Sequence, residues 1–242
     1  MSNIIFITGA SSDIGVGLIK NIVEECVIVA HYNSNEERLL EAQKETKNKI
    51  ITIQADFSST SSVVSMLDEI ENNIGIPNKI IHLASPKFEN IRFRNVNWSD
   101  FEKELTVSLG SITQILNRFL PKMAIQKRGK VLTILSSVTI GVPPKALAQY
   151  TSVKYAVLGL MKALASEYAS KNIAINCISP SMVETQFLSL LNERIVEFTA
   201  ESHPLKRNAT VSDLISVMLM LISDETTYIN GVNIPVTGGS NF

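Results

Sequence analysis

Charged residues are scarce in this chain of 242 residues. They make up 19% of it, against roughly 25% in an ordinary soluble domain, and the formal net charge is −1. Nucleic acids and anionic membranes attract proteins through clustered Lys and Arg, and a nearly neutral chain offers no such attraction. The apolar run Leu214–Ile222 is broken by Ser216 and is far shorter than the roughly 20 residues that a bilayer requires. We therefore expect neither nucleic acid nor membrane as a partner.

The first residues lack the features of a secretion signal, and cysteine is nearly absent. No Lys or Arg precedes Lys20, and the apolar run Ile4–Ile7 is too short for the hydrophobic part of a signal peptide. The two cysteines, Cys26 and Cys177, lie in or beside apolar runs, where a small buried thiol is the ordinary outcome. We expect a cytoplasmic protein, and we assign no metal site and no cysteine chemistry.

Short apolar runs alternate with longer segments of helical period, and no Gly- or Pro-rich linker separates two halves. Most runs show no alternation of apolar and polar residues, which is typical of parallel strands covered by helices on both faces. The expected strands are Ile4–Thr8, Val27–His31, Ile50–Gln54, Lys79–Ala84, Lys130–Leu135, Ala174–Ile178 and Val232–Val236. We predict an α/β fold, with one domain over residues 1–242 and a single doubly wound parallel sheet of about seven strands.

Two helical segments, Asn97–Ala124 and Gln149–Ser170, are the longest and carry apolar residues on more than one face. Only one face of such a helix can pack on the sheet. We expect some of the remaining apolar surface to contact another subunit.

A glycine turn directly follows the first expected strand and opens a helix near Ile14. It reads Thr8-Gly9-Ala10-Ser11-Ser12-Asp13-Ile14-Gly15. Gly9 permits the tight turn, Gly15 lets helix and strand approach closely, and free N–H groups at the helix start attract a pyrophosphate. This order predicts a dinucleotide site of the Rossmann type, with an ordinary strand-to-helix turn as the alternative. The expected cofactor contacts here are Gly9, Ser11, Ser12, Asp13, Ile14 and Gly15.

The residues after the second expected strand bear on which nicotinamide cofactor binds. NAD sites have an acidic residue there for the ribose 2′-hydroxyl, whereas this chain has His31-Tyr32-Asn33-Ser34. Because this segment has no carboxylate, it would not repel a 2′-phosphate, and Asn33 and Ser34 offer hydrogen-bond donors. No Arg or Lys is present in the segment to neutralise the phosphate. We favour NADP(H) over NAD(H), with a plain polar loop as the alternative.

A Tyr and a Lys four residues apart, Tyr150 and Lys154, open another expected helix and share one face of it. Tyr titrates near pH 10, roughly, so proton transfer at neutral pH requires a lower pKa, which the Lys154 ammonium is expected to provide. Ser137 lies at the end of the fifth expected strand, where its hydroxyl could hold a substrate oxygen beside Tyr150. Strand ends and helix starts meet at the carboxyl edge of such sheets, where ligands bind.

Taken in order, these motifs resemble the short-chain dehydrogenase/reductase family over essentially the whole chain. The glycine turn, Ser137, the pair Tyr150 and Lys154, and the segment Asn230–Gly239 all occur in the family's order. The resemblance implies Tyr150 as general acid or base, Ser137 as the group that positions the substrate, and Lys154 as a ligand of the nicotinamide ribose. It also implies a homotetramer or homodimer. Further cofactor contacts implied by the resemblance are Asp56, Phe57, Ala84, Ser85, Pro180, Val183 and Thr185.

Several positions depart from the family's pattern, among them Asp13, His82 and Ser108. Asp13 replaces the middle glycine of the turn; we expect it to point outward as a helix N-cap, so that Asp13→Gly changes cofactor affinity little. His82, expected to be buried structure, begins His82-Leu83-Ala84-Ser85 where the family has Asn-Asn-Ala-Gly. Ser108 stands at or beside an Asn that holds a helix irregularity and a relay water in the family. Because Ser also bonds to backbone, Ser108 is the fourth catalytic candidate.

The resemblance implies an NAD(P)H-dependent oxidoreductase that reduces a carbonyl to an alcohol, with a proton from Tyr150. The chain is most similar to the 3-oxoacyl-acyl-carrier-protein reductase group, which makes a 3-oxoacyl thioester the leading substrate. Two alternatives stay open: an alcohol or sugar dehydrogenase of the same family, and a cofactor-binding scaffold with little turnover. A variable lid around residues 184–205 is expected over the substrate, and its apolar residues, such as Phe187, form either the wall of the site or packed core.

Overall fold

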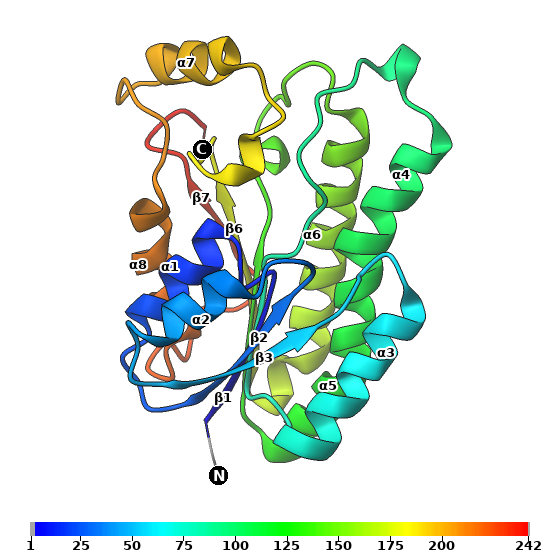
Figure 1. Ribbon diagram of the computed structural model, residues 1–242, viewed down its shortest axis with the longest axis vertical. Helices are drawn as coiled ribbons and strands as arrows, with labels where there is room; N and C mark the ends of the chain where they lie inside the picture. Colours follow the sequence, from blue (N-terminus) through cyan, green and yellow to red (C-terminus); the bar gives the residue numbers. More distant parts are fainter. Residues whose placement is uncertain (1–2, 242) are drawn as a thin grey trace.

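Seven parallel strands form one sheet in the computed structural model, which describes residues 3–241 (Figure 1). The strands are β1 (Ile4–Thr8), β2 (Val27–Tyr32), β3 (Lys49–Gln54), β4 (Lys79–His82), β5 (Gly129–Ile134), β6 (Ile173–Pro180) and β7 (Asn233–Val236). Their order is β3-β2-β1-β4-β5-β6-β7, so the direction of winding reverses between β3 and β4. The predicted α/β fold with a doubly wound parallel sheet is confirmed. Residues 1–2 and 242 of the expected domain lie outside the described residues.

Helices cover both faces of the sheet (Figure 1). One layer contains α1 (Asp13–Asn21), α2 (Glu37–Gln43) and α8 (Val211–Ile222). The other contains α3 (Thr60–Glu69), α5 (Ser111–Gln126) and α6 (Ala148–Tyr168), with α4 (Trp98–Glu104) packed against α6. The helix α7 (Glu193–Ser202) stands at one end of the molecule, within the expected lid.

Strand β1 shows why its sequence lacks alternation. All of its residues are buried. Ile4 and Phe6 belong to the core beneath α3, α5 and α6, whereas Ile5 and Ile7 belong to the core beneath α1 and α8. Burial of each large apolar side chain contributes about 1.5–3 kcal/mol. Both faces therefore require apolar residues, which confirms the sequence-based interpretation of these runs.

Two details of the elements lie near the site. β4 ends at His82 rather than at the predicted Ala84, because the following N–H groups turn to the Thr8 hydroxyl. The helical segment expected over Asn97–Ala124 contains a π-helical turn, η3 (Leu105–Gly110), between α4 and α5. Turns of this kind are frequent at functional sites.

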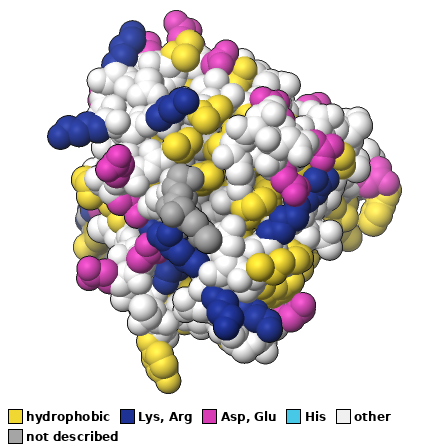
Figure 2. All heavy atoms as spheres, turned by 90° about the horizontal axis from the view of Figure 1, so that it is seen from below, with side chains coloured by type: hydrophobic (Ala, Val, Ile, Leu, Met, Phe, Trp, Pro, Cys, Tyr) yellow, Lys and Arg dark blue, Asp and Glu magenta, His cyan; other side chains and the backbone are white. Residues whose placement is uncertain are grey.

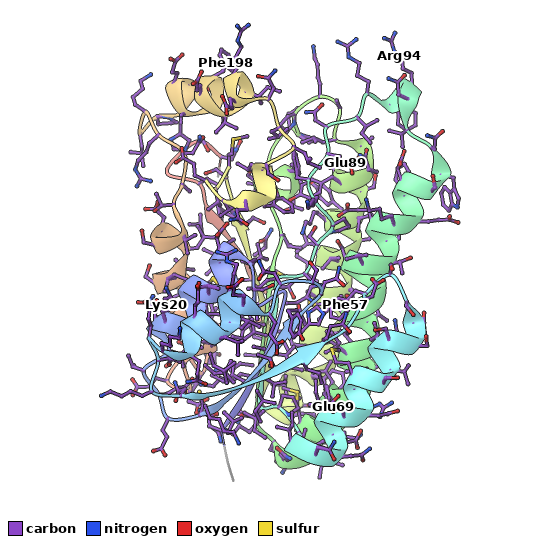
Figure 3. The ribbon with its side chains drawn as sticks, in the orientation of Figure 1. Lys20, Phe57, Glu69, Glu89, Arg94 and Phe198 are labelled. Carbon is purple, nitrogen blue, oxygen red and sulfur yellow. The ribbon has the colours of Figure 1, made fainter. Side chains whose placement is uncertain are left out.

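The carboxyl ends of the strands open toward the end of the molecule that carries α7 (Figure 1). Figure 3 shows Glu89 and Phe198 at this end, beyond Phe57, and Glu69 at the opposite one. On the face seen from below, basic and acidic side chains are interspersed (Figure 2). Cys26 and Cys177 are free and buried, as predicted. Over residues 3–241, no helix has the length and apolar character needed to cross a membrane.

Candidate functional site

The turn between β1 and α1 contains two glycines whose missing Cβ atoms allow close contacts between main-chain segments. Gly9 has a φ of +61°, and a Cβ placed on it would lie 3.0 Å from the main-chain N of Ala84. A Cβ on Gly15 would lie 2.4 Å from the carbonyl oxygen of Ala10. Larger residues at either position would force the backbone to move. The two glycines therefore fix the path of the turn.

His31, near the end of β2, holds this turn in place. Its Nδ1 accepts from the N–H of Gly9 at 3.0 Å, so the ring proton is on Nε2, which donates to the Ala55 carbonyl at 3.0 Å. Its ring also stacks on Phe57, with centroids 4.0 Å apart. Burial lowers the pKa of His31 to about 4, so the ring is neutral near pH 7 and suits both bonds. No sequence motif points to this role.

Ser12, not Asp13, caps helix α1. The Ser12 hydroxyl accepts from the N–H of Gly15 at 3.1 Å, and Asp13 is the first helical residue. The predicted capping role of Asp13 is therefore wrong, because the hydroxyl one residue earlier already takes the free N–H group. Within the described part of the chain, the N–H groups of Asp13 and Ile14 find no protein acceptor. Two free donors at the positive end of a helix fit a pyrophosphate.

The carboxylate of Asp13 joins three segments of the chain. Its Oδ1 lies 2.5 Å from Nη2 of Arg38, in the first turn of α2, and its Oδ2 accepts from the main-chain N–H of Gln186 at 2.7 Å. Gln186 begins the short turn η6 (Gln186–Leu188) in the expected lid. Arg38 thus brings a basic side chain to the phosphate turn, although none is present in the segment His31–Ser34. Sequence spacing did not reveal it, because Arg38 reaches back from a helix to the phosphate turn.

The other adenosine-side candidates follow β2 and β3. Asn33 and Ser34 are exposed and available to a ligand. Asp56 accepts from the N–H and the hydroxyl of Ser58, at 2.9 and 2.7 Å, and both bonds lower the pKa of Asp56. Phe57 is only 4% exposed, so its ring belongs to the core and only its main chain can face an adenine.

Thr8 ties the segment after β4 to β1. Its Oγ1 accepts from the N–H of Ala84 at 3.3 Å, and its hydroxyl lies 2.9 Å from Nδ1 of His82. His82 is 3% exposed, and burial lowers its pKa to about 3, which agrees with the buried structural role predicted for it. These bonds hold Ala84 beside Gly9, at the carboxyl edge of the sheet, and Ser85 follows it in the chain.

Tyr150 and Lys154 lie on the first turns of α6, against the end of β5. Nζ of Lys154 is 5.4 Å from the centroid of the Tyr150 ring and donates to the Ile134 carbonyl at 3.3 Å. Ser137 follows that carbonyl by three residues and begins the turn η4 (Ser137–Thr139). The fold thus brings the three residues of the predicted catalytic motif to one edge of the sheet.

In the protein without bound ligand, burial has the largest effect on the pKa of Tyr150. It raises the pKa of Tyr150 above its ordinary value, while the Ser136 hydroxyl lowers it. Burial also lowers the pKa of Lys154, because it disfavours the charged form of either group. The prediction that the Lys154 ammonium sets a lowered pKa of Tyr150 is therefore wrong for the chain without ligands. No sequence pattern could show how fully both side chains are desolvated.

Two aromatic rings cover Tyr150. Phe88, from the loop after β4, meets the Tyr150 ring edge-to-face at 5.1 Å, and Phe187 of η6 packs on Phe88 at 5.7 Å. Val138 and Leu147 complete this apolar cluster. Phe187 thus packs over the catalytic motif, together with Phe88, which no motif singled out.

The segment after β6 brings the last cofactor candidates to the same edge. Pro180 ends β6, and Val183 forms an isolated parallel bridge to the chain before α8. The Thr185 hydroxyl donates to the Val183 carbonyl at 3.3 Å. The Ser179 and Thr139 hydroxyls, 2.9 Å apart, tie β6 to η4. The turn with Ser137 is therefore braced from the neighbouring strand.

Ser108 lies inside η3 and is 2% exposed. Its hydroxyl donates to Oε1 of Glu104 at 3.1 Å. The helix irregularity implied by the family resemblance is thus present around a Ser instead of an Asn. Glu104 is a buried acid that no motif indicated, because its place in a helical segment is equally typical of a solvent-exposed residue.

Comparisons with known proteins match this arrangement. A family model described as enoyl-(acyl carrier protein) reductase matches residues 9–241. The 3-oxoacyl-[acyl-carrier-protein] reductase FabG of Staphylococcus aureus (strain Mu50) is 28% identical over 245 residues, which cover 99% of this chain and 98% of that protein. The acetoacetyl-CoA reductase of Allochromatium vinosum is 27% identical over 244 residues, with coverage of 99% and 98%. A crystal structure of a 3-oxoacyl (acyl-carrier-protein) reductase from Agrobacterium tumefaciens C58 with NADP bound has a TM-score of 0.89 and 22% identity, covering 98% and 93% of the two chains.

Proposed function

Because the chain belongs to the short-chain dehydrogenase/reductase family of oxidoreductases, we propose that it is an NADPH-dependent reductase that converts a carbonyl to an alcohol. One observation carries the proposal. Tyr150 and Lys154 meet the end of β5 beside Ser137, at the same sheet edge as a phosphate turn with two free N–H donors. Maintenance of the fold alone does not require this combination.

The residues of the chain provide the proton and the orientation. Tyr150 donates its phenolic proton to the carbonyl oxygen, which the Ser137 hydroxyl holds in position. Lys154, fixed by the Ile134 carbonyl, stabilises the phenolate that Tyr150 becomes. Phe88 and the lid exclude water from the phenol. Bound NADPH would supply the hydride. Its pyrophosphate would lie on the turn formed by Gly9, Ser11, Ser12, Ile14 and Gly15.

NADPH is favoured over NADH by the residues around the adenosine side. Asn33 and Ser34 are exposed donors, and no acidic side chain ends β2. Arg38 adds a positive charge that reaches the phosphate turn. An Arg in this region accommodates the 2′-phosphate in folds of this type.

The leading substrate is a 3-oxoacyl thioester. The apolar cluster of Phe88, Val138, Leu147 and Phe187 around Tyr150 is suited to the carbon chain of such a compound. The Staphylococcus aureus and Allochromatium vinosum relatives carry names of reductases for 3-oxoacyl thioesters. A lid over residues 184–205 would close the site through Phe187 and α7.

We assign the protein to the cytoplasm and expect a homotetramer or homodimer. The support is apolar surface on the outer helices: Trp98 on α4 is 67% exposed and Tyr155 on α6 is 46% exposed. Light scattering at several concentrations tests the assembly, and a persistent monomer would refute the expected interface.

Loss of NADPH absorbance tests the reaction, with a panel of short 3-oxoacyl thioesters, diketones and sugar ketones. We expect turnover on at least one thioester, a loss of about 100-fold or more in Tyr150→Phe, and NADPH binding within about twofold of wild type in that variant. Tyr228→Phe is the matched control, since it makes the same change at a fully exposed position outside the site. Cofactor binding without turnover on any compound, unchanged in Tyr150→Phe, would instead support the scaffold alternative.

A further inference from the structure

The segment expected to form the lid, residues 184–205, is held unequally at its two ends. Near its far end the ring of His203 donates to the Thr237 carbonyl at 2.9 Å. Just beyond the lid, the side chain of Asn208 donates to a carbonyl of α7 at 3.1 Å, and Asn208 is itself 2% exposed. The far end is therefore fixed both to the chain after β7 and to the chain before α8.

The turn η6, near the start of the lid, has far fewer bonds to the rest of the chain. Within residues 3–241, the hydrogen bonds made by Thr185–Leu191 stay inside Val183–Leu191, with one exception. The exception is the main-chain N–H of Gln186, which donates to Oδ2 of Asp13 at 2.7 Å. One hydrogen bond and the packing of Phe187 thus hold this turn in place.

The carboxylate of Asp13 is well placed to hold the turn. Its Oδ1 lies 2.5 Å from Nη2 of Arg38, and the two side chains are 22% and 26% exposed. Ser12 caps α1, so the helix does not engage the carboxylate. A hydrogen bond to an ionised group is roughly twice as strong as a neutral one. Arg38 therefore fixes an anchor that bonds strongly to the N–H of Gln186.

The residue that follows Gln186 covers the catalytic tyrosine. Phe187 packs on Phe88 with ring centroids 5.7 Å apart, and Phe88 meets the Tyr150 ring at 5.1 Å. Phe187 is only partly buried, so its packing alone is a weak restraint. Its position over the catalytic motif depends on the bond that Gln186 makes to the phosphate turn.

We propose that Asp13 is a positioning residue of the reductase: its carboxylate fastens the turn η6 to the phosphate turn and so keeps Phe187 over Tyr150. The effect of Asp13 on turnover rests on the proposed function, whereas the fastening itself exists without cofactor or substrate. The main-chain N–H of Asp13 is also one of the two free donors at the start of α1. One residue would then serve both the cofactor turn and the apolar wall of the substrate site.

Limited proteolysis of the cofactor-free protein tests the fastening. Chymotrypsin cuts after aromatic residues, and its rate at Phe187 follows the fraction of molecules in which η6 has opened. In Asp13→Ala we expect this cut to be about fivefold faster, because the bond to Gln186 is lost. Asp13→Asn keeps an oxygen acceptor for Gln186 and should stay within about twofold of wild type. Equal rates in wild type and Asp13→Ala would overturn the proposal.

Two controls separate a local effect from a loss of stability. Asp68→Ala makes the same substitution in an ion pair of α3 with Arg118 and should leave the cut at Phe187 unchanged. Phe119 is fully buried in the core, so it is cut only when the whole domain unfolds. Cutting at Phe119 that rises as much as cutting at Phe187 in Asp13→Ala would show a general loss of stability and refute the positioning role.

A kinetic comparison at saturating NADPH tests the consequence for the reaction. In Asp13→Ala we expect KM for a long-chain 3-oxoacyl thioester to rise about fivefold with kcat changed less, because the apolar wall is loosened while Tyr150 keeps its place. Asp13→Asn should keep the KM of wild type. An equal rise in both variants would refute the proposal, since they share only the loss of charge. If wild type shows no turnover at all, the proposed function fails, whereas proteolysis still decides whether Asp13 fastens η6.

Discussion

The charge of Asp13 provides the sharpest test of the phosphate turn. The predicted outward cap implied little effect on cofactor binding, but the observed carboxylate is bound to Arg38 and to the N–H of Gln186. It therefore occupies the rim of the turn and holds Arg38, a cation that could serve a phosphate there. Asp13→Asn keeps an acceptor for Gln186 and removes only the charge.

The magnitude follows from the position of Asp13 at the start of α1. A charge in the first turn of a helix interacts with its surroundings by about 0.3–1 kcal/mol when it is near the surface. Asp13 is 22% exposed and Arg38 is 26% exposed, so solvent screens both only in part. Removal of one negative charge and release of Arg38 together should favour NADPH by about 1 kcal/mol, or about fivefold in Kd.

Titration of cofactor fluorescence measures this effect at low and at moderate salt. We expect the Kd of NADPH to fall about fivefold in Asp13→Asn, and the gain to shrink as salt screens the charges. Glu45→Gln is the control, because Glu45 pairs with Lys20 at the opposite end of α1, at 2.8 Å. A Kd unchanged within about twofold, or weaker binding, would refute the reasoning and restore the neutral role expected from sequence.

Two further predictions concern buried charges. Lys79 is wholly buried with Nζ 2.6 Å from Glu24 and 3.7 Å from Asp224, so Glu24→Gln should lower the free energy of unfolding by about 3 kcal/mol. Lys79→Met removes the buried charge and should cost less in urea unfolding; the reverse order would contradict this account. His31 and His82, with pKa values lowered by burial to about 4 and about 3, stay neutral in the folded chain while the unfolded chain binds protons below pH 6.5. The free energy of unfolding should therefore fall by about 3 kcal/mol between pH 6.5 and pH 5, and a flat profile would show that these rings already carry protons when folded.

The strands were predictable because one physical pattern controls them. β1 must supply apolar side chains to two cores, and its sequence shows this directly. The ends of strands are set by longer-range bonds, so β4 stops at His82 only because Thr8, far away in sequence, accepts the next N–H groups. The local sequence pattern of a strand cannot predict a hydrogen bond to a residue that is distant in sequence.

For the same reason, the residues of the catalytic motif could be predicted from sequence, whereas the residues that surround them could not. Tyr150 and Lys154 have a fixed spacing in one helix and can be found in sequence. Phe88 and Phe187, 5.7 Å apart, come from different loops and have no spacing to recognise. Glu104 resembles any solvated helical acid until α6 covers it.

The turn η3 shows that one residue that differs from the family's pattern does not by itself indicate that a structural feature is lost. Ser108 stands at or beside an Asn that holds the helix irregularity of the family, and the π-helical turn is present around this Ser. Neighbouring side chains bond to carbonyls of this turn: the Ser111 hydroxyl donates to the Val107 carbonyl at 2.6 Å, and the Thr113 hydroxyl donates to the Leu109 carbonyl at 2.7 Å. Several hydroxyls thus support the local backbone, and Ser108 is left to orient Glu104. The departure in sequence therefore changes the side chain at this position, while the π-helical shape of the backbone around it is kept.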